Sequence, residues 1–504
     1  MSDFQNKSLS KRFLSGFKWN IIGQVLTVSL GLLLSAVIAR GLGPNDYGLY
    51  ASVFAIIGMI PFLISLGFEA IINVRLPALL LKRKEKGISN IVYFIRTLFI
   101  FRFIVSFLVG IVLYLFAVEI AGMIHQKNIA NYLRVASICV VFTGGISLLS
   151  MVFIAQLKIM FTRMLEISKQ IIILAFAVIL LRSGLGVYGV IYATIIGSIV
   201  VFFVYVFFAR NYLFARSEKS DFSQFYGIGF TAWVVGFVGF VLGKQIDIIL
   251  LNYFGVPSSQ IGFYNIAFTF SLMLSFLGVG MGPIFQAIFS ETFEKKGVKG
   301  LADSWYIIAK IGILLWFPIA VFSLLYASQI ITIIYGNVYA LASGPFRILV
   351  SLKIIYVLLN ASFAMPVFYL INKKKVGLGL RIAAGLLNVI LDIILIPKFG
   401  MYGAVFATGF SLALIGILEI GIVVKNIQAR LPFAFYSKII FVFGLALFPT
   451  LLITGETIMF IVAKGIVYVV SSIVLMGLVK PLEERDKQFV KSANESLYRL
   501  IKFF

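Results

Sequence analysis

The chain has 504 residues, of which 61% are hydrophobic and 12% are charged, and its formal net charge is +24. A soluble domain is close to half apolar and a quarter charged, so this composition excludes a water-soluble fold. The single cysteine, Cys139, and the single histidine, His125, exclude a disulfide framework and a cysteine or histidine cluster for a metal.

Apolar runs of about 20 residues recur from end to end, and each is long enough to cross a bilayer core of about 30 Å. We therefore predict an all-α polytopic membrane protein with about fourteen transmembrane helices. The predicted spans are residues 19–38, 47–67, 91–117, 133–156, 165–181, 187–208, 225–251, 261–282, 305–326, 346–371, 376–396, 402–424, 437–453 and 458–479.

Lysine and arginine are concentrated on alternate connections between these spans. If the amino terminus is cytoplasmic, the outer side receives only Arg40, Lys127, Arg134, Arg182, Lys244, Arg347 and Lys398. Because connections rich in lysine and arginine stay inside, this asymmetry predicts that both termini are cytoplasmic. Most of the net charge then faces anionic inner-leaflet lipid, and no nucleic-acid partner is expected.

Two separate segments of the chain recur at one offset of 214 residues. The turn after the first span supplies three matched pairs, Gly48 with Gly262, Tyr50 with Tyr264 and Phe54 with Phe268. The sequence GVYGVIYAT at 186–194 corresponds in the same way to GMYGAVFAT at 400–408. Because both segments share one offset, we interpret the chain as a duplication.

The duplication predicts the domain organisation. Each copy holds six spans, so an N-lobe (1–208) and a C-lobe (223–424) enter the membrane the same way up, related by an axis along the membrane normal. Residues 433–480 add the last two spans, and residues 481–504 form a cytoplasmic amphipathic tail. Parallel-repeat transporters bind their substrate at the interface of the repeats.

Several motifs also carry a family resemblance. They are ARGLGPNDYGLYA after the first span, DIILLNYFG and IGFYNIA at spans seven and eight, IIYGNVYALA before span ten, and LNVILDIILIPKFGMYGAVFAT across spans eleven and twelve. In this order they resemble polysaccharide-biosynthesis exporters of the multidrug/oligosaccharidyl-lipid/polysaccharide (MOP) superfamily, specifically O-antigen-type (Wzx-like) flippases. The resemblance covers essentially the whole chain.

The resemblance implies two six-helix lobes that form a V around a central cavity. It also implies alternating access, in which an undecaprenyl-diphosphate-linked oligosaccharide moves from the inner to the outer leaflet of the bacterial cytoplasmic membrane. The expected partners are this lipid-linked substrate and membrane lipids. Other membrane proteins of polysaccharide assembly stay open as further partners.

A polar stripe marks the first span. Its residues Asn20, Gln24, Thr27, Gly31 and Ser35 are three or four positions apart and therefore share one helical face. We interpret Asn20, Gln24 and Thr27 as lining the cavity, with Arg40 at its outer rim. The alternative is a helix-packing face, because small polar residues also allow helices to approach closely.

Four basic residues inside predicted spans are candidates for substrate contact. Lys353 lies several residues in from an outer end and is the best placed for a phosphate. Arg102, Lys310 and Arg381 lie in the cytoplasmic halves of their spans. The alternative for these three is that the charged group snorkels to the interface.

Two acidic residues are candidates for proton or ion coupling. Asp247 lies near the outer end of the seventh span, and Asp392 lies in the eleventh span, five residues before Pro397. An ionised side chain at mid-bilayer costs roughly 2.5–3.5 kcal/mol on insertion scales, so each needs a partner or a wet cavity. A structural role is the alternative for Asp392.

No catalytic constellation, nucleotide-binding motif or metal-ligand spacing is present, so we expect neither an enzyme nor a cofactor. Two transport alternatives remain: a drug/cation antiporter of the same superfamily and a peptidoglycan-precursor lipid flippase. A membrane glycosyltransferase or polymerase would need a sizeable outer loop with catalytic acids or bases. The longest outer connections, near 118–132 and 327–345, offer few such groups.

Overall fold

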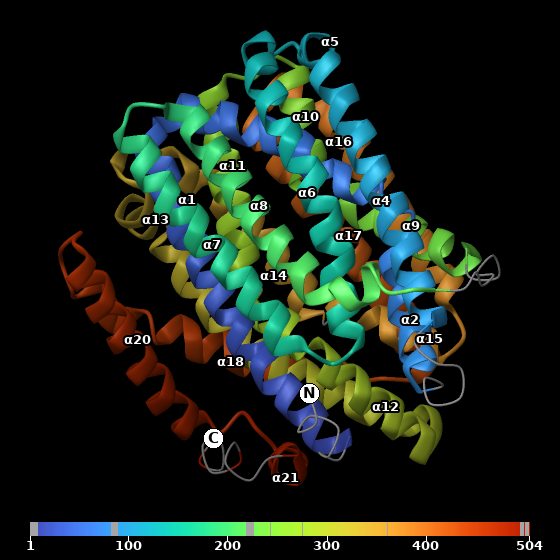
Figure 1. The fold of residues 1–504 in the computed structure, drawn as a ribbon. Helices are drawn as coiled ribbons and strands as arrows, with labels where there is room; N and C mark the ends of the chain where they lie inside the picture. The colour runs from blue at the N-terminus through green and yellow to red at the C-terminus, as the bar shows by residue number, and fades with distance from the viewer. Residues whose placement is uncertain are drawn as a thin grey trace. The chain divides into compact units, whose positions relative to one another are not determined.

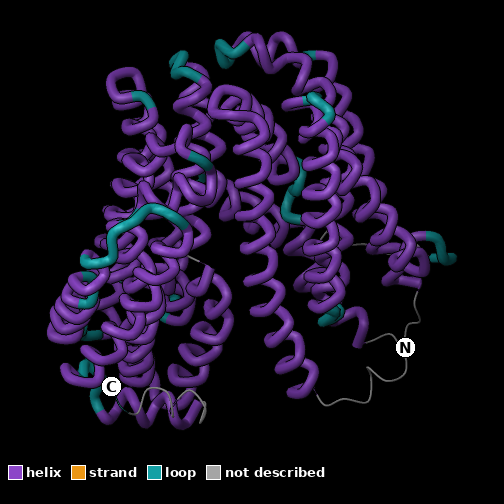
Figure 2. The backbone as a smooth tube through the Cα atoms, turned by 90° about the vertical axis from the view of Figure 1, so that its left-hand side faces the viewer, coloured by secondary structure: helices purple, strands orange, loops and turns teal. Residues whose placement is uncertain are grey.

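The computed structural model describes residues 9–81, 89–217, 226–241, 243–274, 276–359 and 361–493, together with Tyr498 and Phe503. Throughout this part of the chain the regular structure is helical and contains no strand (Figure 2). Eleven of the described stretches are long and apolar enough to cross a membrane. The predicted all-α polytopic membrane fold is therefore confirmed.

The helices follow one another with short connections (Figure 1). Their bounds are α1 (Leu9–Leu63), α2 (Phe68–Leu81), α4 (Ser89–Leu115), α5 (Ala117–Met123), η1 (Lys127–Ile129), α6 (Ala130–Ala155), α7 (Ile159–Arg182), α8 (Gly186–Leu213), α9 (Tyr226–Val241), α10 (Lys244–Tyr253), α11 (Ser258–Leu274), α12 (Phe276–Leu325), α13 (Ala327–Tyr335), η3 (Asn337–Ala342), α14 (Ser343–Leu358), η4 (Ala361–Phe363), α15 (Ala364–Leu370), α16 (Lys374–Phe399), α17 (Met401–Ile427), α18 (Phe433–Leu445), α19 (Phe448–Leu451), α20 (Ile458–Val479) and α21 (Glu484–Ala493).

The eleven apolar stretches account for most of the predicted spans. The first of them, Ile22–Leu63, holds two spans, because Gly43 adopts φ 75° and kinks α1 just before Pro44. The seventh and eighth predicted spans are not among the eleven. The seventh is split between α9 and α10, and the eighth passes through residue 275, which lies outside the described residues.

The eighth span also ends later than the sequence predicts. It was expected to finish at residue 282, but α12 continues without a break to Gly297, where φ is 60°. Polar residues from Ser290 onwards extend the same helix beyond the apolar run.

The helices form two compact units. The first contains residues 1–265 and 389–404, and the second contains residues 266–388 and 405–504. These boundaries differ from those of the two sequence repeats. The reason is that α9 and α10 pack against α1, and α9 also packs against α2. The division into an N-lobe and a C-lobe stays a prediction.

In the first unit, α7 runs along α1, and α6 packs against both α4 and α8 (Figure 1). One buried apolar cluster joins the later part of α1 to α5, α6 and α8, with Leu133 and Cys139 at its centre. A second cluster joins α2, α4, α6 and α8 around Phe94 and Leu149. Cys139 is a buried core residue.

In the second unit, α12 is the element to which the others attach, since it packs against α14, α15 and α18. One apolar cluster joins α12, α15 and α17 around Trp305. Another joins α12, α18 and α20 and includes Leu482, which precedes the tail helix α21. The predicted tail begins with this helix. Residues 494–497, 499–502 and 504 lie outside the described part of the chain.

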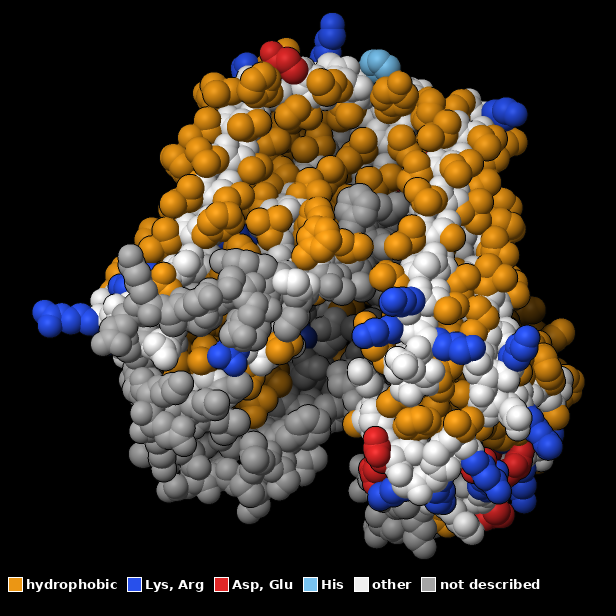
Figure 3. All heavy atoms as spheres, turned by 90° about the vertical axis from the view of Figure 1, so that its right-hand side faces the viewer, with side chains coloured by type: hydrophobic (Ala, Val, Ile, Leu, Met, Phe, Trp, Pro, Cys, Tyr) orange, Lys and Arg blue, Asp and Glu red, His pale blue; other side chains and the backbone are white. Residues whose placement is uncertain are grey.

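The described surface is largely apolar. Figure 3 shows hydrophobic side chains over much of the visible face, with most of the visible lysines and arginines in the lower half. Large apolar residues on α20, including Met459 and Leu478, are more than 70% exposed. Such surface is stable when hydrocarbon covers it, as expected for a membrane protein.

The two repeated turns pack against each other within the first unit. A β-carbon at Gly48 would overlap the backbone carbonyl of Ser258, and one at Gly262 would lie 2.7 Å from the Pro44 carbonyl oxygen. Ser258 and Pro44 are themselves separated by the repeat offset of 214 residues. The contact is therefore reciprocal, and glycine in both copies permits the close approach.

Hydrogen bonds reinforce this contact. Asn252 Nδ2 donates to Ser52 Oγ at 2.9 Å, and Gln126 Nε2 donates to Ser258 Oγ at 3.1 Å. Because Ser52 is on α1, Asn252 on α10 and Gln126 in the connection after α5, three parts of the first unit are joined here.

We predict that Gly48→Ala destabilises the folded protein. The added methyl group must displace the Ser258 backbone, and overpacking of this kind costs about 1–3 kcal/mol. Thermal unfolding of the detergent-purified protein measures the effect. Gly421→Ala is the matched control, because it lies in α17 with nothing within 4 Å of its added carbon, and helix propensity favours it. Equal unfolding temperatures for the two variants would contradict the prediction.

Candidate functional site

A break in the seventh span creates a polar buried region in the first unit. Gly236, Gly239 and Gly243 weaken this apolar run, and Gly243 adopts an extended conformation with φ −93° and ψ 159°. A new helix, α10, then starts at Lys244 and places Asp247 in its first turn. An acidic residue at this position is stabilised by the positive end of the helix dipole.

Asp247 and Asp392 form a buried acidic pair in the first unit. Both side chains are fully buried, and their carboxyl groups are joined by a hydrogen bond. The Tyr264 hydroxyl donates a further hydrogen bond to Asp247 Oδ2. Two carboxyl groups in hydrogen-bond contact share a proton, because two adjacent carboxylates repel each other.

The pair is a site of two carboxylates. Among the described residues, no group of three or more histidine, cysteine, aspartate or glutamate side chains is arranged to hold a metal ion. Proton or ion coupling by Asp247 and Asp392 stays a prediction.

A second chain of polar groups starts one turn away on α10. Lys244 Nζ donates to Asn265 Oδ1 at 2.8 Å, and Asn265 Nδ2 donates to the Tyr47 hydroxyl at 3.1 Å. The Tyr47 hydroxyl lies 3.1 Å from Ser35 Oγ. Ser35 and Tyr47 lie on opposite sides of the Gly43 kink, so this chain connects both halves of α1 to α10 and α11.

The predicted lining residues of the first span are spread along α1. Gln24 and Thr27 are half-buried, and Thr27 Oγ1 has no hydrogen-bond partner among the described residues. Arg40 is exposed and lies about 24 Å from Gln24 along the helix axis. The Asn20 side chain lies outside the described part of the structure.

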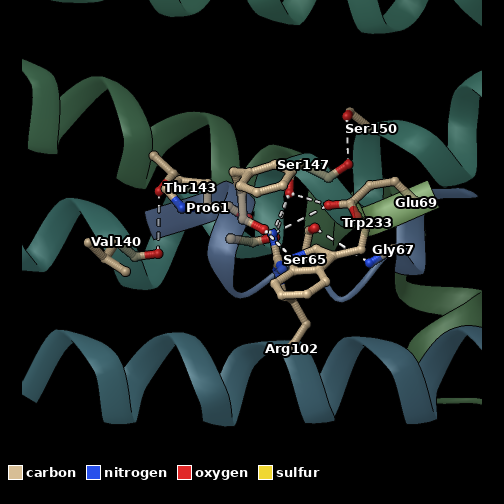
Figure 4. Close-up of polar contacts among 12 residues, drawn as sticks. Pro61, Ser65, Gly67, Glu69, Arg102, Val140, Thr143, Ser147, Ser150 and Trp233 are labelled. Carbon is tan, nitrogen blue, oxygen red and sulfur yellow. Dashed lines mark hydrogen bonds and ion pairs between the residues drawn. The ribbon is translucent and has the colours of Figure 1, made fainter. Parts of the chain in front are cut away.

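Arg102 is held inside the first unit (Figure 4). Its side chain is 1% exposed, and its Nη2 donates to the Pro61 carbonyl at 2.8 Å, to Ser147 Oγ at 3.3 Å and to Glu69 Oε1 at 3.4 Å. Its Nε lies 3.4 Å from the Gly144 carbonyl oxygen. The guanidinium thus caps a carbonyl at the end of α1 and ties α4 to α2 and α6.

Lys310 is fully buried in the second unit and pairs with two carboxylates of the tail. Its Nζ lies 2.9 Å from Glu483 Oε1 and 2.8 Å from Asp486 Oδ2. The hydrogen bond from Lys310 lowers the pKa of Glu483, which lies outside the spans. Arg485 and Asp303 form a further ion pair of 2.6 Å between the tail and α12.

Lys353 and Arg381 are also in the second unit. Lys353 is 8% exposed, and its Nζ donates to Ser271 Oγ at 3.0 Å and lies 5.4 Å from the centre of the Phe268 ring. Arg381 Nε donates to Glu419 Oε1 at 2.9 Å. Substrate contact by Lys353, Arg102, Lys310 and Arg381 stays a prediction.

The structure thus brings together Asp247 and Asp392, which the sequence predicted separately and without a partner. Sequence reasoning missed Lys244, which it counted as an outer-loop charge, and it also missed Asn265 and Tyr264. The signal that could have found Lys244 is Gly243, because a break directly before a charged residue inside an apolar run frees that residue to turn inwards.

Comparison with known proteins identifies the family. The sequence matches the polysaccharide biosynthesis protein family over residues 37–343, more than half of the chain. The chain belongs to this family. It is 23% identical over 404 residues to a probable low-salt glycan biosynthesis flippase of Haloferax volcanii, covering 79% of this chain and 80% of that protein.

Solved structures show the same fold. A lipid II flippase, MurJ, in an inward closed conformation superimposes with a TM-score of 0.69 at 18% identity, over 91% of this chain and 97% of that one. An inward-facing multidrug resistance MATE family transporter of the MOP superfamily gives a TM-score of 0.62 at 15% identity, over 80% and 94% of the two chains. The resemblance to polysaccharide-biosynthesis proteins is confirmed by the family match, and the chain is a multi-pass membrane protein that shares its fold with these two structures.

We predict that Lys310→Met strongly destabilises the protein. The substitution leaves the buried Asp486 carboxylate without its cation, and breaking a buried pair in this way costs about 3–5 kcal/mol. The measurement is thermal unfolding in detergent. Lys295→Met removes an exposed ion pair with Glu291 and serves as the control, with an expected effect below about 1 kcal/mol. A similar loss in both variants would show that burial of the pair is not what matters.

Proposed function

We propose that the protein is a flippase for an undecaprenyl-diphosphate-linked oligosaccharide, the repeat unit of a surface polysaccharide. It carries this lipid from the inner to the outer leaflet of the cytoplasmic membrane by alternating access, with both termini on the cytoplasmic side. The observation that carries the proposal is membership of the polysaccharide biosynthesis family. The Haloferax volcanii protein, a probable glycan biosynthesis flippase, supports it.

The chemistry of the buried residues is consistent with such a substrate. A diphosphate is stable inside a membrane protein only where cations and hydrogen-bond donors replace its water. Lys353 supplies a buried ammonium group that has one protein hydrogen-bond acceptor, Ser271 Oγ, among the described residues, although an ammonium can donate three hydrogen bonds. We propose Lys353 as a contact for the diphosphate.

Disruption of the gene in the source organism tests the transport proposal. We expect the lipid-linked oligosaccharide to accumulate on the inner leaflet, and the surface polysaccharide to be lost, because the proposed flippase is the step that moves the repeat unit outwards. Labelling of the glycan in inverted and right-side-out vesicles measures the distribution. Normal surface polysaccharide would contradict the proposal. Rescue of a strain depleted of its lipid II flippase, or cation-driven dye export by proteoliposomes, would instead favour one of the two transport alternatives.

We further propose that the acidic pair couples transport to a proton or a monovalent cation. Asp247 and Asp392 come from α10 and α16, so a proton or cation between them changes the free energy of holding these two helices together. When it leaves, two buried carboxylates repel each other. A site of this kind can bias one conformation over another.

We predict that Asp247→Asn and Asp392→Asn each reduce transport at least tenfold and make the remaining transport insensitive to the coupling ion. An asparagine amide can keep the hydrogen bond to its carboxyl neighbour, but it removes the charge that the ion balances. Proteoliposome assays in sodium and in choline, at several pH values, measure the dependence. A variant that keeps the ion dependence of the wild type would contradict the coupling role, whatever its rate.

A further inference from the structure

Arg381 differs from the other buried cations in how its guanidinium is held. Its Nε donates to Glu419 Oε1 at 2.9 Å, and Glu419 is fully buried whereas 32% of the Arg381 side chain is exposed. Both residues belong to the second unit, Arg381 on α16 and Glu419 on α17. The Glu419 carboxylate therefore fixes the Nε edge of the Arg381 guanidinium.

The other edge is available. The described residues provide no protein hydrogen-bond partner for either Nη group of Arg381, and these carry four of the five N–H donors of a guanidinium. Arg102 is the contrast, because its side chain is 1% exposed, its Nη2 donates to the Pro61 carbonyl, Ser147 and Glu69, and its unpartnered Nη1 is buried. Lys310 is fully buried beneath two carboxylates.

The surroundings of Arg381 favour an anion. Three exposed lysines, Lys373, Lys374 and Lys375, lie at the amino-terminal end of α16, where the helix dipole is positive. Arg381 is seven residues beyond Lys374, which is about 10 Å along the axis and close to the same helical face.

We propose that Arg381, positioned by Glu419, binds the phosphate group of a lipid at this end of the second unit. A guanidinium fixed through Nε presents its two Nη groups in the plane that suits two phosphate oxygens. The phosphate belongs either to the diphosphate of the transported lipid, in which case the inference rests on the proposed function, or to a membrane phospholipid. Glu419 acts through Arg381 and is a positioning residue.

The arrangement also explains why a carboxylate stands beside an anion site. An arginine in a membrane helix without a partner would be costly in the absence of ligand. Glu419 keeps the guanidinium paired when no phosphate is bound, and it uses Nε, so that the donors facing the ligand stay free. The Lys373–Lys375 group supplies the net positive charge that the neutral Arg381–Glu419 pair lacks.

The test is binding of defined lipids to the purified full-length protein, followed by native mass spectrometry. The probes are undecaprenyl diphosphate, phosphatidylglycerol and uncharged undecaprenol. We expect Arg381→Gln to weaken undecaprenyl diphosphate binding about ten- to hundredfold while undecaprenol binding is unchanged, because only the phosphate contact is lost. Arg381→Lys should lose most of the same affinity, since lysine keeps the charge but has no planar fork.

Glu419 is tested by a pair of variants. Glu419→Gln keeps an oxygen that can accept the Nε hydrogen bond and should bind nearly as the wild type does. Glu419→Leu removes the acceptor and should lose most of the affinity although Arg381 is intact. If Glu419→Leu lowers only the unfolding temperature, with the affinity of the folded protein unchanged, the positioning role is wrong.

Arg347→Gln is the matched control. Arg347 is an exposed arginine of the second unit. Like Arg381, it donates from Nε to a protein acceptor, here the Leu324 carbonyl at 3.2 Å. This variant should bind all three probes as the wild type does. Undecaprenyl diphosphate binding by Arg381→Gln equal to that of the wild type would overturn the proposal.

The two sources of phosphate give different results. If Arg381→Gln weakens undecaprenyl diphosphate alone, the site takes the diphosphate of the transported lipid. If phosphatidylglycerol is weakened equally, the site takes a membrane phospholipid. Failure of the flippase proposal is distinguishable from failure of this one, because wild-type protein that moves no lipid-linked oligosaccharide can still show Arg381-dependent phosphate binding.

Discussion

Hydrocarbon offers no hydrogen bonds, so each charged group inside a membrane helix depends on a partner within the protein. The described residues meet this requirement in three ways. Arg102 donates to backbone carbonyls and to Glu69. Lys310 is paired with two carboxylates. Asp247 and Asp392 are joined to each other, which requires a proton or a cation between them.

Helix breaks create several of these partners. Where α1 ends, the Pro61 carbonyl has no next helical turn to bond with, and Arg102 supplies the missing donor. Where the seventh span breaks at Gly243, α10 starts anew and brings Lys244 and Asp247 to the polar residues of α11. Two breaks in apolar helices thus position part of the buried polar chemistry of the first unit.

The basic residues separate into two kinds by how many protein acceptors their N–H donors contact. Arg102 contacts four protein acceptors through Nε and Nη2, and Lys310 pairs with two carboxylates, so their burial makes them contributors to stability. Arg381 and Lys353 each have one protein acceptor among the described residues. A group of the second kind can still donate to a further acceptor, because most of its N–H donors have no described protein partner.

The sequence by itself determined the membrane class, the helical fold, the positions of most spans and the family, because long apolar runs, breaker residues and ordered motifs are local properties. It also singled out Asp247, Asp392 and Arg381 as charges that needed an explanation. Only the tertiary structure decided that the two aspartates meet, that Lys310 belongs to the tail and that Arg381 rests on Glu419. The residues of these pairs are between 38 and 176 positions apart in the sequence. Which charged residues pair depends on how the helices pack, and a local sequence pattern contains no information about that packing.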